Sequence, residues 1–175
     1  MKEQEFTSSF AWATLVMQNE LYVCGALVLG RSLRNNESKA SMICMVTDDV
    51  TRECCEALED VWDYVVVVPK IVAAKPVQQR PQTRFGHMYQ PWLQNCLTKF
   101  NILQMVHFQK ICFLDSDMLC LNNPDELFDC RTPAGVCDSL RFSIDAQDQW
   151  HGRYLPEAEV RNALNGHHYG ISGIF

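Results

Sequence analysis

The sequence predicts an α/β fold with a mostly parallel sheet and helices on both faces. Short apolar runs of strand length alternate with amphipathic stretches of helical period, and the connections between them are short. Some of the runs are apolar at nearly every position, as in strands that are buried on both faces. With 175 residues, of which 47% are hydrophobic and 21% charged, the chain is long enough for one compact domain.

The first half of the chain carries the β-α-β-α-β part of this pattern. The expected elements are a strand at residues 10–17, a helix at 21–33, a strand at 41–47, a helix at 51–62 and a strand at 64–68. Asn19 is a candidate N-cap of the first helix and Thr51 of the second. Pro69 ends the third strand because it cannot donate a ladder hydrogen bond.

A proline-punctuated connection at residues 71–91 separates this half from the next, and a connection of that length is usually functional or mobile. The expected elements beyond it are a helix at 92–107, a strand at 110–114 and a strand at 134–138. Residues 169–175 are mostly apolar up to the last residue. Because domains rarely end inside a hydrophobic strand, we expect the domain to be incomplete at its C-terminus.

Charge, hydropathy and cysteine usage exclude several classes of protein. The net charge of −6 argues against a surface that binds nucleic acid. No apolar run approaches the ~20 residues of a membrane span, and the N-terminus lacks the apolar core of a secretory signal, so we expect a cytoplasmic protein. The nine cysteines lie partly in apolar runs and form no C-x-x-C pair, which is typical of reduced thiols.

The strongest candidate site is Asp115-Ser116-Asp117, directly after the predicted strand 110–114. Both aspartates are flanked by apolar runs, and a desolvated carboxylate beside a second one needs a compensating positive charge. A hard divalent cation at Asp115 and Asp117 would supply it, at the strand end where parallel sheets bind ligands. The alternative is a turn in which Asp115 caps a backbone N–H and Asp117 faces water.

A second candidate site, Asn19 and Tyr22, follows the first predicted strand. The ring could stack on a nucleobase while the amide binds the polar edge of the base or a ribose hydroxyl. The more ordinary alternative is a helix cap and a half-buried tyrosine. Lys99 lies beside the apolar stripe of the helix at 92–107, where it could neutralise a phosphate or remain a solvated lysine.

Three ordered motifs resemble glycosyltransferase family 8, and specifically its glycogenin-like branch. The family's opening strand and helix are similar to TLVMQNELYVCGALVLGRSLR. Its next strand, helix and strand are similar to SMICMVTDDVTRECCEALEDVWDYVVVV. Its most diagnostic block, a helix, a strand and the D-x-D, is similar to LTKFNILQMVHFQKICFLDSDMLCLNNPDELFD. The similarity extends from about residue 10 to residue 138, and GISGIF shows a weaker similarity to the family.

The resemblance implies a GT-A (Rossmann-like) fold and transfer of a hexose, with retention of configuration, from a UDP-sugar such as UDP-glucose or UDP-galactose. It implies Mn²⁺ or Mg²⁺ bridging Asp115, Asp117 and the diphosphate, as a Lewis acid and a clamp. It assigns no catalytic residue to this chain. The nucleotide-sugar site that it implies consists of Val16, through its backbone, and of Asn19, Tyr22, Lys99, Asp115, Ser116, Asp117, Ser172 and Gly173.

The chain departs from the family at Ile171, where the family has asparagine before a Ser/Ala-Gly pair. By this resemblance, the family's aspartate-glutamine segment and the histidine that completes the metal shell would lie beyond Phe175. We therefore expect residues 1–175 to form a single, incomplete nucleotide-sugar-binding domain. An inactive UDP-sugar-binding module and an α/β interaction protein are the alternatives. The acceptor is a carbohydrate or a protein, and a homodimer is compatible with the sequence.

Overall fold

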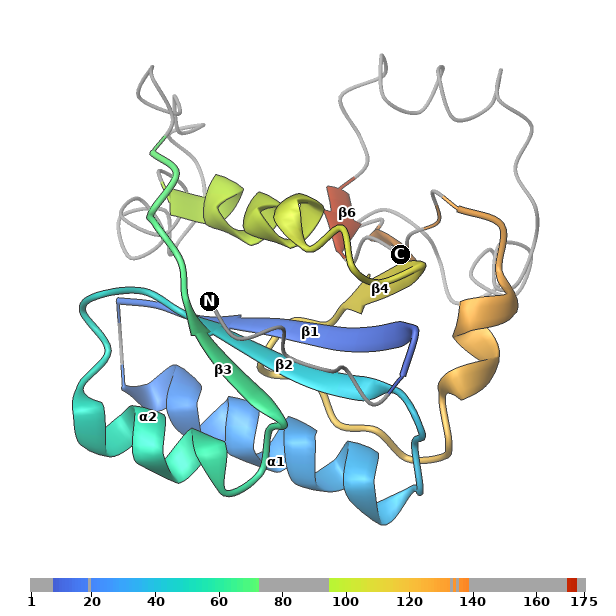
Figure 1. The fold of residues 1–175 in the computed structure, drawn as a ribbon, viewed down its shortest axis with the longest axis horizontal. Helices are drawn as coiled ribbons and strands as arrows, with labels where there is room; N and C mark the ends of the chain where they lie inside the picture. The colour runs from blue at the N-terminus through green and yellow to red at the C-terminus, as the bar shows by residue number, and fades with distance from the viewer. Residues whose placement is uncertain are drawn as a thin grey trace.

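The computed structural model describes residues 8–18, 20–72, 95–132, 134, 136–138 and 170–172. At its centre is a four-stranded sheet of order β3-β2-β1-β4 (Figure 1). The strands are β1 (Phe10–Val16), β2 (Ser41–Val46), β3 (Tyr64–Val67) and β4 (Lys110–Phe113). Each neighbouring pair runs parallel. These four strands lie where the sequence predicts them, and the parallel sheet confirms the expected class.

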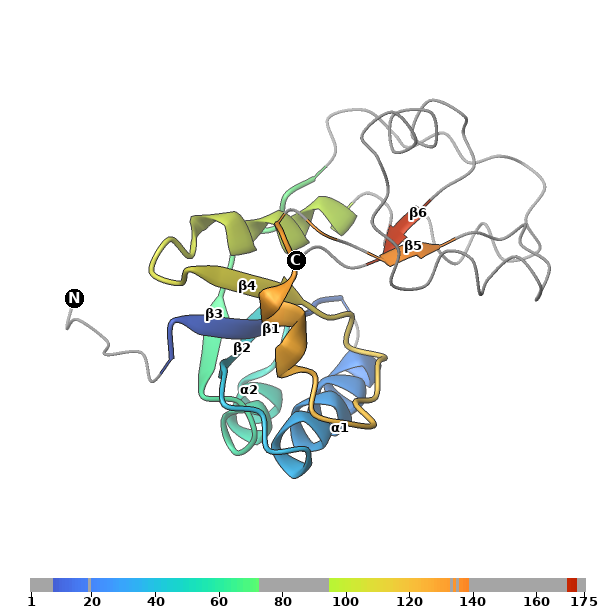
Figure 2. The same ribbon diagram turned by 90° about the vertical axis from the view of Figure 1, so that its right-hand side faces the viewer.

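Helices cover both faces of the sheet, as the sequence predicts. Helices α1 (Leu21–Asn35) and α2 (Arg52–Glu59) lie together on one face, and the 3₁₀-helix η1 (Cys96–Gln104) lies on the other (Figure 1, Figure 2). The side chains of β1 alternate between the two faces: Trp12 packs under α1, whereas Ala13 packs on the side of η1. Because both faces are covered, every residue of β2 is buried.

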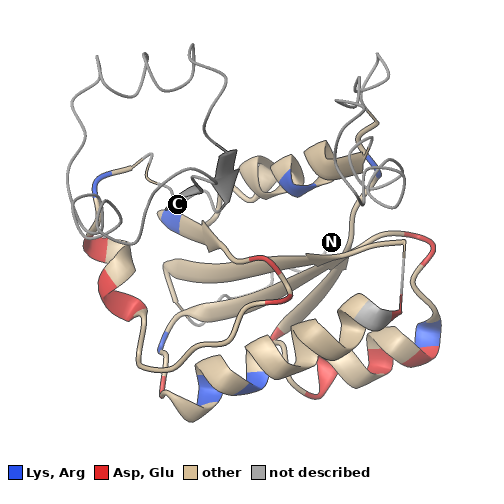
Figure 3. Ribbon diagram, turned by 180° about the vertical axis from the view of Figure 1, so that it is seen from behind, with Lys and Arg blue, Asp and Glu red and all other residues tan. Residues whose placement is uncertain are grey.

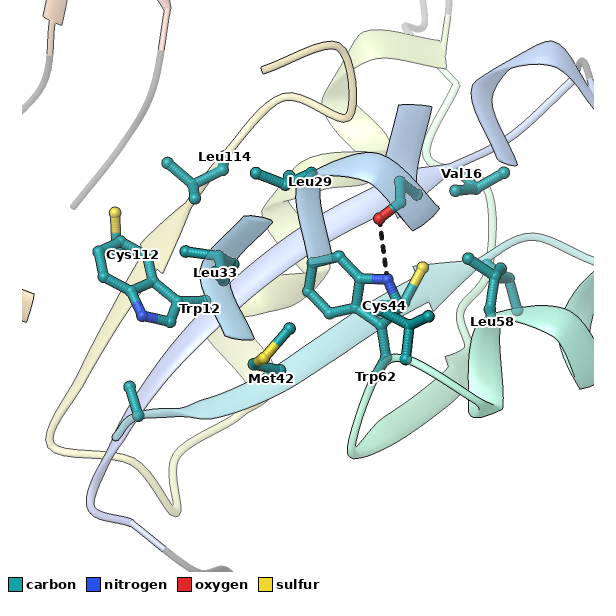
Figure 4. Packing of buried hydrophobic residues seen from close by; sticks show 14 of the residues in the cluster. Trp12, Val16, Leu29, Leu33, Met42, Cys44, Leu58, Trp62, Cys112 and Leu114 are labelled. Atoms are coloured by element: carbon teal, nitrogen blue, oxygen red, sulfur yellow. Dashed lines mark hydrogen bonds between the residues drawn. The ribbon is translucent and has the colours of Figure 1, made fainter. Parts of the chain in front are cut away.

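The larger part of the core lies between the sheet and the two α-helices (Figure 4). Trp12 and Leu29 are almost completely buried there, and Cys44 of β2 packs in the same cluster. The indole N–H of Trp62 donates a hydrogen bond to the carbonyl of Ala26 at 3.1 Å, so the buried ring has no unpaired donor. This bond and the surrounding apolar contacts fix α1 against the end of α2.

Both helices lie where the sequence predicts them, although α2 ends at Glu59 rather than at residue 62, and the predicted cap is correct for α2 but not for α1. Thr51 is the N-cap of α2, and its hydroxyl accepts a hydrogen bond from the N–H of Cys54 at 3.4 Å. The N-cap position of α1 is held by Glu20, not by Asn19 as the sequence predicts, and its side chain makes no capping hydrogen bond. Gln18, at the end of β1, has a φ of 64°, so the chain turns in a left-handed conformation before the helix begins.

Two predicted elements in the second half of the chain differ from the structure. Where the sequence predicts a helix at 92–107, the structure has the shorter 3₁₀-helix η1. Residues 92–94 of the predicted helix lie outside the described residues. The predicted fifth strand exists as β5 (Val136–Asp138), but it does not join the parallel sheet. It pairs antiparallel with β6 (Gly170–Ser172) in a separate two-stranded sheet. Most of the proline-punctuated connection 71–91 lies outside the described residues.

The described cysteines behave as the sequence predicts. The eight cysteines whose side chains the structure describes are all free thiols. Cys44 and Cys112 are buried, and burial raises the pKa of both thiols, so they act as small core hydrophobes. Within the described part of the chain, no helix combines the length and the apolar character that a membrane span requires.

Candidate functional site

The strand order creates a crevice between the carboxyl ends of β1 and β4. The chain moves outward from β1 through β2 to β3 and then crosses back to place β4 on the other side of β1. The strand order reverses between β1 and β4, and open α/β sheets bind ligands at such a switch point. A cavity of about 270 Å³ lies here, lined by Leu15, Met17, Tyr22, Cys96, Lys99, Phe113, Asp115, Ser116 and Asp117.

The turn that carries the two aspartates, residues 115–117, is fastened to β1. The N–H of Leu114 donates to the carbonyl of Ala13 at 2.8 Å, and the buried hydroxyl of Thr14 donates to the carbonyl of Leu114 at 2.8 Å. The N–H of Met118 donates to the carbonyl of Asp115 at 3.2 Å and closes the turn. The acidic turn therefore starts from a fixed point on the central strand.

The sequence left open whether Asp115 is a turn residue or a cation ligand. A turn is present, but it is closed by the main-chain carbonyl of Asp115, and no described residue donates a hydrogen bond to its carboxylate. The carboxylate is half-buried, and burial raises its pKa above the ordinary value; the nearby Lys99 charge lowers the pKa, and Asp117 raises it further. The negative charge of an ionised Asp115 is thus only partly compensated by the positive charge of Lys99.

Lys99 is brought to this site by η1. Its ammonium lies 5.8 Å from the centre of the Phe113 ring, and it is close enough to Asp115 to lower the pKa of that carboxyl group. A lysine on the flank of a predicted helix is ordinarily solvated. The packing of η1 over the end of β4 instead makes Lys99 part of the cavity wall.

The other predicted site residues are placed as follows. Tyr22 on α1 and the buried Ser116 both line the cavity. The side chain of Val16 lies in the core under α1, and its carbonyl accepts a hydrogen bond from the N–H of Thr47 at 3.2 Å. Ser172 belongs to β6. Asn19 and Gly173 lie outside the described residues.

Leu15 and Met17 also line the cavity, and the sequence analysis did not select them. Strand alternation was the signal that could have found them: if Val16 faces α1, its two neighbours face the opposite side of the sheet. Cys96 and Phe113 complete the wall. The cavity therefore has an apolar part at the end of β1 and a charged part at the end of β4.

A polar cluster around Asp49 supports the turn between β1 and α1. One carboxylate oxygen of Asp49 accepts the N–H of the left-handed Gln18 at 3.0 Å, and the other contacts the hydroxyl of Thr47 and the ammonium of Lys70, the latter at 3.2 Å. Partial burial acts to raise the pKa of Asp49. The bonds from Thr47 and Lys70, a backbone bond and the lysine charge outweigh it, so the pKa is below its usual value.

The donor set at the acidic turn fits a hard divalent cation that takes further ligands from a bound anion. Asp115 and Asp117 offer carboxylate oxygens, which Mg²⁺ and Mn²⁺ prefer. Within the described residues, no three histidine, cysteine or acidic side chains converge as a complete metal site. Two carboxylates with open space beside them match a cation that is bound together with an oxygen-rich ligand such as a diphosphate.

The parallel Rossmann-like sheet, with a cavity and an acidic turn at its switch point, places the chain in the class of α/β proteins whose open sheets bind ligands at that point. Comparison with known proteins narrows this class. The family model described as glycosyl transferase family 8 matches residues 14–159. The chain belongs to glycosyltransferase family 8, and its sheet is that of the GT-A fold. This confirms the resemblance that the sequence motifs carry.

Relatives in the glycogenin group support the branch that the motifs indicate. The chain is 35% identical to glycogenin of Neurospora crassa over 119 residues, covering 67% of this chain and 16% of that protein. It is 32% identical to human glycogenin-1 over 173 residues, covering 94% and 47%. It is 32% identical to inositol phosphorylceramide glucuronosyltransferase 1 of Arabidopsis thaliana over 139 residues, covering 78% and 23%. The chain thus spans less than half the length of these relatives.

Among solved structures, the chain has a weak similarity to the apo form of the glycosyltransferase GlyE of Streptococcus pneumoniae TIGR4. The two chains share 13% identity with a TM-score of 0.45, over 91% of this chain and 44% of that one. The family assignment does not depend on this likeness.

Proposed function

We propose that the protein transfers a hexosyl group from a UDP-sugar to an acceptor, with Mn²⁺ or Mg²⁺ held by Asp115 and Asp117. The half-buried Asp115 carboxylate carries this proposal, because its charge lies in a cavity at the switch point and Lys99 compensates it only in part. Membership of glycosyltransferase family 8 supports glycosyl transfer as the chemistry. UDP-glucose and UDP-galactose are the donors that we propose to test first.

The two parts of the cavity match the two ends of a nucleoside diphosphate. Leu15, Met17 and the ring of Tyr22 form an apolar wall that suits the flat base. Lys99 and the acidic turn lie at the other end, where the diphosphate would bind together with the cation. In this arrangement α1 orients the base through Tyr22, and β4 orients the diphosphate through the turn.

The residues at the end of β4 would hold charge during transfer. Asp115 and Asp117 would hold the cation through their carboxylate oxygens, and Lys99 adds a positive charge beside them. When bound, the cation offsets the negative charge that develops on the departing diphosphate. Retention of the anomeric configuration, which the family resemblance implies, belongs to the same proposal, as does the cytoplasmic location expected from the sequence.

An inactive UDP-sugar-binding module is the second candidate. One observation favours it: the described residues supply two acidic ligands but no complete metal site. In this case the chain would bind the donor nucleotide without turning it over.

Calorimetry with UDP and Mn²⁺ tests the binding part of the proposal. We expect the wild type to bind UDP in a metal-dependent way and the double variant Asp115→Ala/Asp117→Ala to lose this binding. The control is Asp60→Ala/Asp129→Ala, which removes the same charge from two exposed aspartates outside the cavity. Equal metal-dependent binding by the wild type and the Asp115→Ala/Asp117→Ala variant would contradict the assignment of these carboxylates.

Release of UDP from UDP-glucose and UDP-galactose, with and without added maltose, separates the two candidates. Metal-dependent release by the wild type supports the transferase, and its loss in Asp115→Ala/Asp117→Ala ties the release to this site. Metal-dependent UDP binding without release from either donor supports the binding module instead.

A further inference from the structure

Helix α1 contains two glycines, Gly25 and Gly30, although glycine is a poor helix former. Both lie at close contacts. A Cβ atom at Gly25 would lie 2.5 Å from the carbonyl oxygen of Ser116, and one at Gly30 would lie 2.6 Å from Val61 Cγ1. Distances below 3.0 Å are essentially never seen for real Cβ atoms. At each position the close neighbour leaves no room for a Cβ atom, which explains why glycine is present despite its low helix propensity.

The two neighbours differ in kind. Gly30 faces side chains, those of Val61 and Trp62 beyond the end of α2. Gly25 faces the backbone of the acidic turn, at the residue between the two aspartates. Ser116 is itself buried, and a buried main-chain carbonyl moves only when its segment moves. A side chain at position 25 would therefore displace the turn rather than a flexible group.

The segment after the acidic turn is also held by α1. The hydroxyl of Ser32 accepts the N–H of Cys120 at 3.0 Å and donates to the carbonyl of Leu29 at 2.7 Å. The amide of Asn36 donates to the carbonyl of Cys120 at 2.9 Å. Both backbone groups of Cys120 are thus bonded to side chains at the C-terminal end of α1, one from Ser32 within the helix and one from its C-cap residue Asn36.

A second attachment follows at the 3₁₀-helix η2 (Asp125–Asp129), which Figure 3 shows as an acidic segment beyond the turn after β4. The carboxylate of Asp125 accepts the hydroxyl of Ser38 at 2.6 Å and the N–H of Lys39 at 2.8 Å. Contacts from α1 and from the loop before β2 thus hold Cys120 and Asp125 in place. The acidic turn lies between the anchored end of β4 and this anchored segment, so its position depends on the surface of α1.

We propose that Gly25 is a positioning residue for the cation and nucleotide site. Tyr22 precedes it by three residues, so the two lie on the same side of α1, next to the cavity. The contact between Gly25 and Ser116 sets the distance between Tyr22, at the base end of the cavity, and the two carboxylates. A nucleotide and a cation that bind together need that distance. This inference rests on the proposed function.

Gly25→Ala and Gly30→Ala form a matched pair, because both add one methyl group to the same helix. We expect Gly25→Ala to weaken UDP binding in the presence of Mn²⁺ by at least tenfold and Gly30→Ala to change it less than twofold. The decisive quantity is the ratio of the UDP dissociation constants in EDTA and in Mn²⁺. A merely structural role leaves this ratio unchanged, whereas displacement of the turn reduces it.

Hydrogen exchange of the ligand-free protein gives a readout that does not depend on any ligand. We expect faster exchange at the amides of residues 114–120 in Gly25→Ala, but not in Gly30→Ala. Ser32→Ala, which removes the acceptor of the Cys120 N–H, is the second variant in case Gly25→Ala does not fold. It should speed exchange of the Cys120 amide and weaken UDP binding in Mn²⁺ about threefold.

Three outcomes would overturn the inference. The ratio of UDP dissociation constants in EDTA and in Mn²⁺ could be unchanged in Gly25→Ala, or it could fall equally in Gly30→Ala. The amides of residues 114–120 could also exchange at the wild-type rate in Gly25→Ala. If Gly25→Ala does not fold, an unchanged UDP affinity in Ser32→Ala would overturn the inference as well. If the wild type does not bind UDP with Mn²⁺, the proposed function fails, and the ligand part of this inference fails with it. The exchange experiment still decides whether Gly25 positions the turn.

Discussion

Replacing Asp49 by alanine would remove the group that ties three strand ends together. Its carboxylate accepts a hydrogen bond from the left-handed Gln18, contacts the buried hydroxyl of Thr47 and forms an ion pair with Lys70. Gln18 lies at the end of β1, from which the chain leads to Tyr22. The change should therefore lower both the stability of the fold and the affinity for UDP.

The size of the stability loss follows from these contacts. Two hydrogen bonds at a partly exposed carboxylate contribute about 1 kcal/mol each, and an exposed ion pair adds about 0.5 kcal/mol or less. We expect Asp49→Ala to lower the free energy of unfolding by about 2 kcal/mol, which corresponds to roughly 4–8 °C in Tm for a domain of this size. Urea and thermal unfolding at pH 7 measure this loss.

Asp48→Ala is the matched control, because the neighbouring Asp48 is 83% exposed and forms an ion pair with the same lysine at 3.3 Å. It should cost less than about 0.5 kcal/mol and leave UDP binding unchanged. Similar losses of stability in both variants would refute the role of Asp49 at the strand ends.

The dependence of stability on pH provides a further check on Asp49. Because the pKa of this carboxyl group is lower in the folded state than its ordinary value of 3.8, as the Thr47 and Lys70 bonds outweigh partial burial, its stabilising effect is fully present above that value. The effect is lost as the pH falls through the lower folded value. The difference in stability between wild type and Asp49→Ala should therefore stay constant from pH 7 to about pH 5 and shrink below about pH 4.

Three further changes test the cavity. Asp115→Asn should abolish metal-dependent UDP binding and raise the Tm of the ligand-free protein at pH 7. The Tm should rise because burial raises the pKa of Asp115, so that its ionised form is unfavourable in the fold. The gain in Tm should shrink as the pH falls toward 4, and an unchanged Tm at pH 7 would contradict this explanation. Lys99→Met should weaken UDP binding about tenfold, measured by calorimetry, with Lys99→Arg retaining more affinity than Lys99→Met; equal losses would deny the charge a role. Thr14→Val removes the buried hydroxyl that donates to Leu114 and should cost about 1–2 kcal/mol in urea unfolding, and a neutral effect would show that this bond does not hold the turn.

The sheet could be predicted from the sequence because its signals are local. All six residues of β2 are buried, and their apolar run is the pattern of a strand covered on both faces. The cap at Thr51 is likewise a local signal that the structure bears out. The strand order and the separate pairing of β5 with β6 depend on contacts between distant residues, which periodicity does not encode.

The candidate site was predictable in part for the same reason. The position of Asp115 at the end of a buried strand follows from the apolar run before it, and the fold then places that end at the switch point. The proximity of Lys99 depends on how η1 packs, and the contact of Gly25 with Ser116 depends on how α1 packs. The spacing of residues in the sequence predicts neither the distance from Lys99 to Asp115 nor the distance from Gly25 to Ser116. The binding roles assigned to all the site residues stay predictions, and Asn19 and Gly173 lie outside the described residues.

A crystal of the protein grown with UDP and Mn²⁺ and measured at a wavelength where manganese scatters anomalously tests the central claim most directly. We expect an anomalous peak within coordination distance of both the Asp115 and Asp117 carboxylates, with the diphosphate as a further ligand. Bound UDP with no manganese at these two side chains, or manganese at another place in the molecule, would contradict it.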